Sequence, residues 1–306
     1  MDEREFIDTL LRPLGGQGSE NFDDDCAWVQ VGDRWLVVST DTSIERVHFP
    51  STVKGAAATE RAVRIALSDI YAKAASPIGY LAALSVPRSC PDIMLAAYAA
   101  GLQEASDSLG VPLIGGDTTR HDGALTITVT AIGWAGRRLL RNGASVGDGI
   151  WITGPVGMSA LGLKYLQGDV SLPKPSGEEL VSWEDAFLRP DIGLVADLEL
   201  ATASIDVSDG LLADVNQIAK SSGVGCDLRA PDIPFGSAER YVRSVQGLQE
   251  LVTAGDDYVV AFTAPPDSQP KESKRIGVVT KGTGVRLLDR NGADITPIRL
   301  GYSHGG

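Results

Sequence analysis

The chain of 306 residues is long enough for two domains, and its 43% apolar and 22% charged residues are typical of a folded globular protein. Its formal net charge of −13 argues against nucleic acid and membrane surfaces as partners, because both attract lysine- and arginine-rich proteins. Three scattered cysteines and three histidines predict neither a disulfide framework nor a zinc site. The acidic N-terminus and the lack of an apolar run of about 20 residues predict a cytoplasmic protein.

Helix and strand signals alternate along the first half, which predicts a mixed α/β fold. Residues 35–38 form an apolar strand. Residues 57–74 and 91–110 carry apolar side chains at helical spacing, so two helices are expected there. Residues 111–116 read as a short buried strand, and residues 124–134 alternate apolar and threonine side chains. A strand with one threonine face is half-buried, or it packs that face against another subunit.

The second half begins with a basic, glycine-rich change of composition at 136–149. We place the boundary between an N-terminal domain, 1–137, and a C-terminal domain, 138–306, in this stretch. A proline-rich excursion follows near 173–190, for which no regular element is predicted. Strands are expected at WITG, SIDV and YVVAFTA and a helix at LLADVNQIAK, with a final strand and hairpin that turns at Asn291-Gly292.

Aspartates recur at strand ends or within helices, each beside Ser, Thr or Gly. One such Asp is usually a cap or a turn former, but Asp69 lies in mid-helix close to the buried stripe, where an unpaired carboxylate is costly. Hard divalent cations such as Mg²⁺ prefer several carboxylates together with hydroxyl and phosphate oxygens. The set therefore predicts a magnesium site, at which an acidic protein can hold nucleotide phosphates. Its members are Asp24, Asp25, Asp41, Asp69, Asp117, Asp206, Asp209, Asp256 and Asp257.

The phosphate-binding motifs that the sequence contains or lacks limit the class of enzyme. The sequence lacks the P-loop pattern GxxxxGK[ST] and the HRD and DFG motifs, which excludes P-loop enzymes and protein kinases. Glycine-rich stretches at 15–20 and 152–162 could expose backbone N–H groups to phosphate, although each alone is more typical of an ordinary loop.

The order of these motifs resembles the thiamine-monophosphate kinase family of the aminoimidazole-ribonucleotide-synthetase superfamily. STDT, GGDTT and SDGL are typical of the superfamily, whereas VHF, GDDY and GYSH favour the thiamine branch. The matching segments run in the family's order and are DDCA (24–27), STDT (39–42), VHF (47–49), LSD (67–69), LIGGDTTR (113–120), RNGASVGD (141–148), IDVSDGL (205–211), GDDY (255–258) and GYSH (301–304).

The resemblance implies an enzyme that transfers the γ-phosphoryl group of ATP directly to the phosphate of thiamine monophosphate, giving thiamine diphosphate and ADP. It implies several Mg²⁺ ions and no phosphoenzyme, so no single catalytic side chain is expected. It also implies a two-domain α/β fold in which the N-terminal domain forms a β-barrel-like interface in a homodimer.

The resemblance also assigns site residues. The implied metal ligands are Asp25, Ser39, Thr40, Asp41, Asp69, Asp117, Asp206 and Asp209. The implied ATP contacts are Tyr98, Gly116, Asp117, Arg141 and Ser208. The implied thiamine monophosphate contacts are His48, Asp256 and Tyr302.

Two other functions remain compatible with the residues. One is another ATP-using synthetase of the superfamily, and the other is a non-catalytic nucleotide-binding protein. The sequence departs from the family pattern at Asn21–Asp23, Arg46 and Ala66 and after His304, and none of these positions is an implied metal carboxylate.

Overall fold

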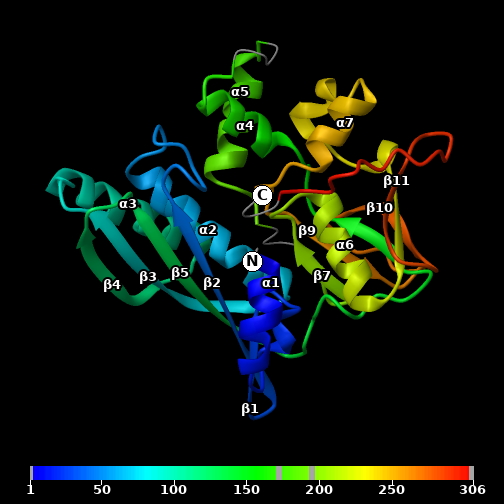
Figure 1. Cartoon of the computed structure of the whole chain (residues 1–306), viewed down its shortest axis with the longest axis horizontal. Helices are drawn as coiled ribbons and strands as arrows, with labels where there is room; N and C mark the ends of the chain where they lie inside the picture. The colour runs from blue at the N-terminus through cyan, green and yellow to red at the C-terminus, as the bar shows by residue number, and fades with distance from the viewer. Residues whose placement is uncertain (1–2, 170–173, 193–196, 303–306) are drawn as a thin grey trace.

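Two β-sheets, one in each half of the chain, organise the computed structural model, which describes residues 3–169, 174–192 and 197–302 (Figure 1). The first sheet has the strand order β1-β2-β5-β3-β4 and is antiparallel except for the β3–β4 pair. Its strands are β1 (Ala27–Val31), β2 (Arg34–Ile44), β3 (Ser76–Pro87), β4 (Leu113–His121) and β5 (Thr126–Ala135).

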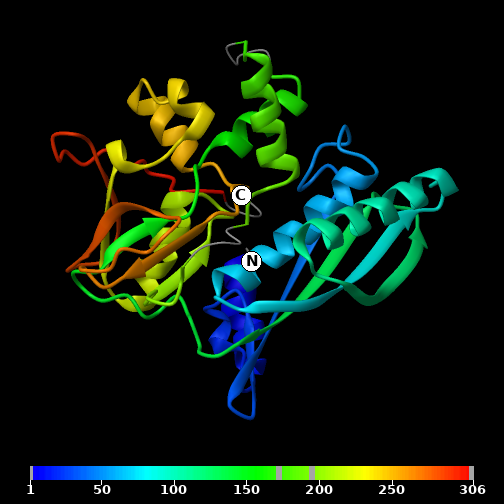
Figure 2. The same cartoon turned by 180° about the vertical axis from the view of Figure 1, so that it is seen from behind.

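Two helices, α2 (Ala56–Ala72) and α3 (Asp92–Leu109), lie against one face of the first sheet (Figures 1 and 2). Helix α2 is buried on almost all sides, because it contacts β2, β3 and β5 and also β7 and β9 of the second sheet. Arg61, Ser68 and Asp69 on this helix face the junction between the two sheets. Both helices confirm the predictions from apolar spacing.

The second sheet has the order β11-β8-β10-β6-β9-β7, and helix α6 (Leu211–Ser222) packs against it. Helix α7 (Val245–Val252) lies in the same half. The predicted strands at WITG, SIDV and YVVAFTA correspond to β6, β7 and β9, and the Asn291-Gly292 turn is present. The strands are β6 (Gly149–Ile152), β7 (Ala203–Asp206), β8 (Gly225–Arg229), β9 (Val260–Ala264), β10 (Lys274–Thr280) and β11 (Gly284–Leu288).

Helices α4 (Met158–Leu166) and α5 (Gly177–Leu188) pack against each other beside the junction. The sequence analysis missed α5 in the proline-rich stretch. Its start carries a capping box, in which Ser176 accepts from Glu179 N–H and the Glu179 side chain accepts from Ser176 N–H. The remaining short helical segments are α1 (Glu3–Phe6), η1 (Ile7–Leu11), η2 (Arg12–Leu14), η3 (Glu20–Phe22), η4 (Ala230–Asp232) and η5 (Gly236–Tyr241).

Strand β2 differs from its prediction. The apolar run was expected to end at Val38, but the strand continues through STDT, because β5 pairs with it from Trp35 to Ile44. The STDT side chains therefore alternate between the two faces of the sheet instead of lying together at a strand end. Among the described residues, no helix is long and apolar enough to cross a membrane.

Candidate functional site

A cavity of about 640 Å³ is lined by residues from both halves of the chain. Its walls come from β2, α2, the segment after β2, α4, and the loops that follow β7 and precede β9. The sequence-predicted site residues that line it are Asp25, Ser39, Thr40, Asp41, His48, Asp69, Asp206, Ser208, Asp209, Asp256 and Tyr302.

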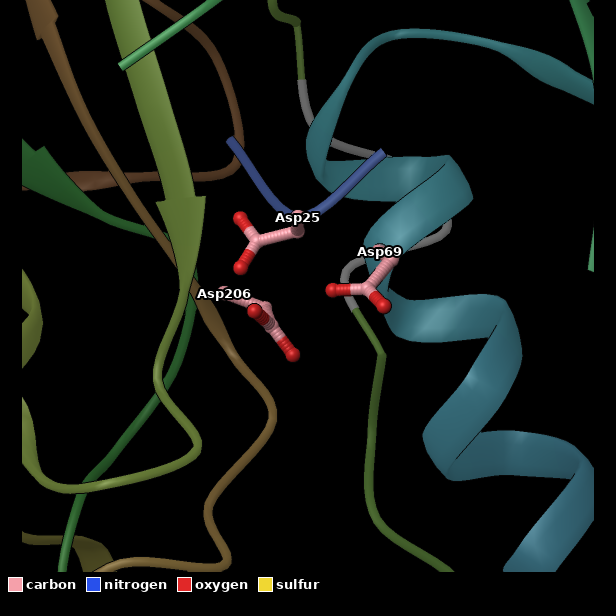
Figure 3. A group of neighbouring side chains, drawn as sticks. All are labelled: Asp25, Asp69 and Asp206. Carbon is pink, nitrogen blue, oxygen red and sulfur yellow. The ribbon is translucent and has the colours of Figure 1, made fainter. Parts of the chain in front are cut away.

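Three of these carboxylates converge at one point (Figure 3). Asp25 precedes β1, Asp69 lies within α2, and Asp206 is the last residue of β7, yet one oxygen atom of each lies within 4.8 Å of the others. Residues separated by up to 181 positions in the chain are thus brought together at the junction of the sheets. Such a set of oxygens matches the ligand preference of Mg²⁺.

Hydroxyl groups orient two of the three carboxylates. Ser39 Oγ donates to Asp69 Oδ2 at 2.5 Å, and Ser68 Oγ donates to Asp206 Oδ2 at 2.5 Å. Ser39 is on β2 and Ser68 is beside Asp69 on α2, so the strand and the helix hold the cluster from two sides. Thr40 Oγ1, by contrast, lies 3.0 Å from Thr130 Oγ1 on the threonine face of the sheet.

Burial and neighbouring acidic groups raise the pKa of two of the cavity carboxylates, Asp41 and Asp69. Burial, and then the charge of Asp206, raise the pKa of Asp41 from 3.8 to about 6. Burial, followed by the charges of Asp206 and Asp41, raises the pKa of Asp69 well above its usual range, against the opposing effects of Ser39 and Lys73. A bound cation would remove this repulsion, so these residues fit a divalent metal.

The raised pKa of Asp41 predicts how stability depends on pH without metal. Because Asp41 has a pKa of about 6 in the folded protein and 3.8 in the unfolded chain, its contribution is present below about pH 4 and is lost as the pH rises through 6. In chelator-treated protein, the free energy of unfolding should fall by up to about 3 kcal/mol between pH 4 and 7. Urea denaturation at a series of pH values measures this, and Asp41→Asn should make the fall smaller. A fall of equal size in that variant would contradict the assignment.

Asp25 is contacted by two cations. Arg141 Nε donates to Asp25 Oδ2 at 3.0 Å and its terminal nitrogen pairs with Oδ1, while Lys73 Nζ lies 3.2 Å from Oδ2. Arg141 itself lines a second pocket of about 420 Å³, beside Asp24 and Lys220. The predicted ATP contact Arg141 is thus coupled directly to a predicted metal ligand.

Two loops form the C-terminal wall of the cavity. Asp256 N–H donates to Ser208 O at 2.9 Å, and Tyr258 N–H donates to Val207 O at 2.8 Å. Tyr302 N–H donates to Asp209 O at 2.9 Å, which holds the C-terminal segment against the same wall. Asp256 has a φ of +71°, a conformation that is costly for a residue with a side chain and is typical of functional sites.

Asp256 is held by a residue that the sequence analysis missed. Arg61 is only 2% exposed, and its guanidinium donates to Asp256 Oδ1 at 2.5 Å and to Phe187 O. The same guanidinium lies 3.9 Å from the centre of the Phe187 ring, and Tyr258 Oη donates to Asp256 Oδ1 at 3.0 Å. The sequence offered only a weak signal for Arg61, because the eight residues between it and Asp69 turn the two side chains by roughly 80° about the axis of α2.

His48 lies at another part of the cavity wall. Its Nδ1 accepts the backbone N–H of Ile44 at 3.0 Å, which assigns the proton of a neutral imidazole to Nε2. Arg46, noted as a departure from the family pattern, also lines the cavity and has a φ of +69°.

Four predicted residues do not line this cavity: Arg141, which lines the second pocket, and three residues on α3 and β4. Tyr98 is buried between α3 and the rest of the first core, where burial raises its pKa to about 12. Gly116 and Asp117 lie on β4, at the edge of the sheet. A side chain at Gly116 would collide with the backbone of β3, since its Cβ would lie 1.9 Å from Ala82 O.

The register of the sheet explains the separation of β4 from the cavity. Asp41 pairs with Val129, Val129 with Ala82, and Ala82 with Gly116, so three strand spacings separate Asp41 from Gly116. At about 4.8 Å per spacing this is roughly 14 Å, too far for Asp117 to join the cluster of its own chain.

Comparison with known proteins identifies the family. Residues 23–135 match the family described as AIR synthase related protein, N-terminal domain. The chain is 33% identical to the thiamine-monophosphate kinase of Caulobacter vibrioides, over 99% of this chain and 91% of the relative. The chain belongs to the thiamine-monophosphate kinase family. The family member from Synechococcus elongatus is 30% identical over 97% of this chain and 98% of its own length.

Solved structures of thiamine-monophosphate kinases share this fold. The structure of AaThiL complexed with AMPPCP and TMP has a TM-score of 0.87 and 26% identity, covering 99% of this chain and 97% of that one. The enzyme from Stenotrophomonas maltophilia has a TM-score of 0.74 and 31% identity, covering 86% and 89% of the two chains. The predicted mixed α/β fold of the superfamily is confirmed. Within the described residues the first sheet is open and does not close into a barrel.

Proposed function

We propose that this chain transfers the γ-phosphoryl group of ATP to the phosphate of thiamine monophosphate, giving thiamine diphosphate and ADP. The observation that carries this proposal is the convergence of Asp25, Asp69 and Asp206 in a cavity whose other walls carry the family's motif residues. The similarity to a structure that holds AMPPCP and TMP supports both substrates. We further propose a cytoplasmic location for this chain.

The acidic end of the cavity would hold Mg²⁺. Two phosphate groups that approach to about 4 Å repel each other by several kcal/mol at an effective dielectric constant near 20. Bound Mg²⁺ would supply the neutralising charge and align the two groups for direct transfer. The proposed side-chain ligands from this chain's own cavity are Asp25, Ser39, Asp41, Asp69, Asp206 and Asp209. The side chain of Thr40 lies on the threonine face, so this predicted ligand could contribute only its backbone oxygen.

The remaining cavity residues would bind and orient the substrates. Arg141, which lines the second pocket and pairs with Asp25 of the large cavity, and Ser208 would contact the ATP phosphates. His48 would donate from Nε2 to the acceptor phosphate. Asp256 would face the cationic thiamine ring, and Tyr302 would stack against it. No side chain has to form a covalent bond, because transfer between two phosphates needs placement and charge neutralisation.

We propose two domains, 1–137 and 138–306, and a homodimer formed through the first sheet. Each proposed domain contains one sheet. The sheet face away from α2 carries the threonines of β2 and β5 together with exposed apolar residues, among them Val29, Val31 and Leu81. Two such faces packed together would bury these residues in a barrel-like interface.

The dimer would also account for the position of β4. Asp117 pairs with Ala83, which pairs with Thr128 of the threonine face, so its side chain lies on the face proposed for the interface. The metal role of Asp117 and the ATP role of Gly116 therefore remain predictions that require the second copy, whereas Tyr98 is buried under α3 on the other face and its ATP role remains a prediction that the dimer does not explain.

A single charge should disrupt the proposed interface. Leu81→Glu places a carboxylate at the centre of this face, beside Thr130, and we expect the protein to become monomeric in analytical ultracentrifugation. Ile93→Glu is the matched control, because Ile93 is 78% exposed on α3 on the other side of the sheet. A Leu81→Glu protein with the same sedimentation as the parent chain would exclude this interface.

The proposed reaction is tested by a product assay. The purified chain is incubated with thiamine monophosphate, ATP and MgCl₂, and thiamine diphosphate is measured by chromatography. The expected result is thiamine diphosphate and ADP in equal amounts, with no product when thiamine monophosphate is omitted. Binding of ATP without any product would favour a non-catalytic nucleotide-binding protein, and ATP consumption without thiamine diphosphate would favour another synthetase of the superfamily.

A further inference from the structure

A fully buried lysine lies directly behind the acidic cluster. Lys73 follows the last residue of α2 and its side chain is 0% exposed. Its Nζ donates to Asp24 Oδ1 at 2.7 Å and to Ser204 O at 3.1 Å, and lies 3.2 Å from Asp25 Oδ2. A buried ammonium group is costly unless it is paired, so three close partners at this position point to a defined role.

Lys73 contacts each segment that carries a carboxylate of the cluster. Asp25 is a direct partner, Asp69 is four residues earlier on the same helix face, and Ser204 is two residues before Asp206 on β7. The ammonium group therefore joins, from the protein side, the three segments whose side chains meet in the cavity. No residue assigned to ATP, metal or thiamine monophosphate does this.

Asp24 acts as the counterion of Lys73. Its side chain is 3% exposed, and both oxygen atoms are engaged, one by Lys73 and the other by Trp28 Nε1 at 2.9 Å. It does not line the large cavity. The pair of Lys73 and Asp24 is thus neutral as a unit, and it lies against Asp25, which does line that cavity.

We propose that Lys73 is a positioning residue for the metal site. Its buried ammonium group orients Asp25 and sets the affinity of the acidic cluster for a divalent cation. This inference rests on the proposed magnesium site. Removing Lys73 leaves Asp24 as an additional negative charge near the cluster, whereas removing the charge of Asp24 leaves Lys73 as an additional positive charge. The affinity for a divalent cation should therefore move in opposite directions in the two variants.

The test is a calorimetric titration of chelator-treated protein with MnCl₂ in the absence of nucleotide. We expect Lys73→Met to bind Mn²⁺ roughly tenfold more tightly than the parent chain, and Asp24→Asn roughly tenfold more weakly. The double variant, which has the parent charge, should bind within about threefold of the parent chain. Lys54→Met, which removes an exposed lysine, controls for the change of net charge.

Thermal unfolding adds a second measurement. Both single variants should unfold at a lower temperature without metal, because Lys73→Met leaves the Asp24 carboxylate without its cation and Asp24→Asn removes the nearest counterion of Lys73. A saturating Mn²⁺ concentration should recover most of this loss in Lys73→Met and little of it in Asp24→Asn.

A purely structural role for Lys73 predicts a different pattern. Both single variants would then bind Mn²⁺ as tightly as the parent chain or more weakly. Saturating Mn²⁺ would change the unfolding temperatures of the two variants by the same amount. Either result, or no Mn²⁺ binding in the parent chain and in Lys73→Met, overturns the inference. The product assay with the parent chain is independent of this outcome, so failure of the inference and failure of the proposed function can be told apart.

Discussion

Replacing Asp69 by Asn should lower kcat by roughly 10³-fold, equivalent to about 4 kcal/mol, without loss of folding stability. Asp69 lies at the centre of the cluster, where its ionised carboxylate is opposed by burial and by Asp206 and Asp41. Asn keeps the shape of the side chain and can still accept a hydrogen bond from Ser39. The substitution removes a negative charge that destabilises the protein without metal. The proposed metal site requires that charge.

The measurements are the steady-state rate of thiamine diphosphate formation and the free energy of unfolding without metal. Asp257→Asn is the matched control, because burial also raises the pKa of Asp257 but its two oxygens accept from Gly157 N–H outside the cavity. That variant should lose stability and keep its activity per folded molecule. An active Asp69→Asn enzyme, or one inactive only because it unfolds, would remove Asp69 from the proposed metal site.

Asp25, Asp69 and Asp206 could be selected from the sequence as site candidates because each lies in a motif whose context is local. Asp69 lies within an apolar helical pattern, and Asp206 ends a buried strand, so both positions were fixed by periodicity and by the family's motifs. That they meet within 4.8 Å depends on α2 lying between the two sheets, which no local pattern specifies.

The positions of Gly116 and Asp117 show the limit of motif reasoning. The motif places them beside a nucleotide, but it does not specify the strand order that puts β4 three strands from β2. The same limit explains why strand β2 was predicted to end too early. A run of four polar residues, STDT, was read as the end of a strand, whereas pairing with β5 extends the strand through it. Tertiary pairing outweighs local polarity there.

Arg61 and Lys73 were missed because a charged residue on a helix is usually on its exposed face. Helix α2 is buried on almost all sides, so Arg61 on the helix and Lys73 just after it face the junction of the sheets. Lys73 is four residues after Asp69, but this spacing becomes informative only once the helix is known to be central.

Replacing Arg61 by Met should destabilise the protein by about 3 kcal/mol and raise the KM for thiamine monophosphate. Arg61 extends from α2 to Asp256 and to Phe187 O at the end of α5, and it is 2% exposed. Loss of one partner of a buried ion pair is strongly destabilising, because the other charge remains without compensation. Asp256 is part of the proposed thiamine monophosphate site and has a φ of +71°, so it also depends on this ion pair for its position.

Arg64→Met is the control on the same helix. Arg64 pairs with Glu60 one turn away, and Glu60 retains Arg189 as a second partner, so we expect a loss of about 1 kcal/mol and an unchanged KM. Urea denaturation and substrate titration of the two variants separate the roles. If Arg61 only supports packing, Arg61→Met lowers stability while KM stays the same, and Asp256 is then positioned by its own backbone. If Arg61 positions the substrate site, KM rises in Arg61→Met alone, and Arg61→Lys restores part of the stability but little of the KM, because an ammonium group cannot contact Asp256, Phe187 O and the Phe187 ring together.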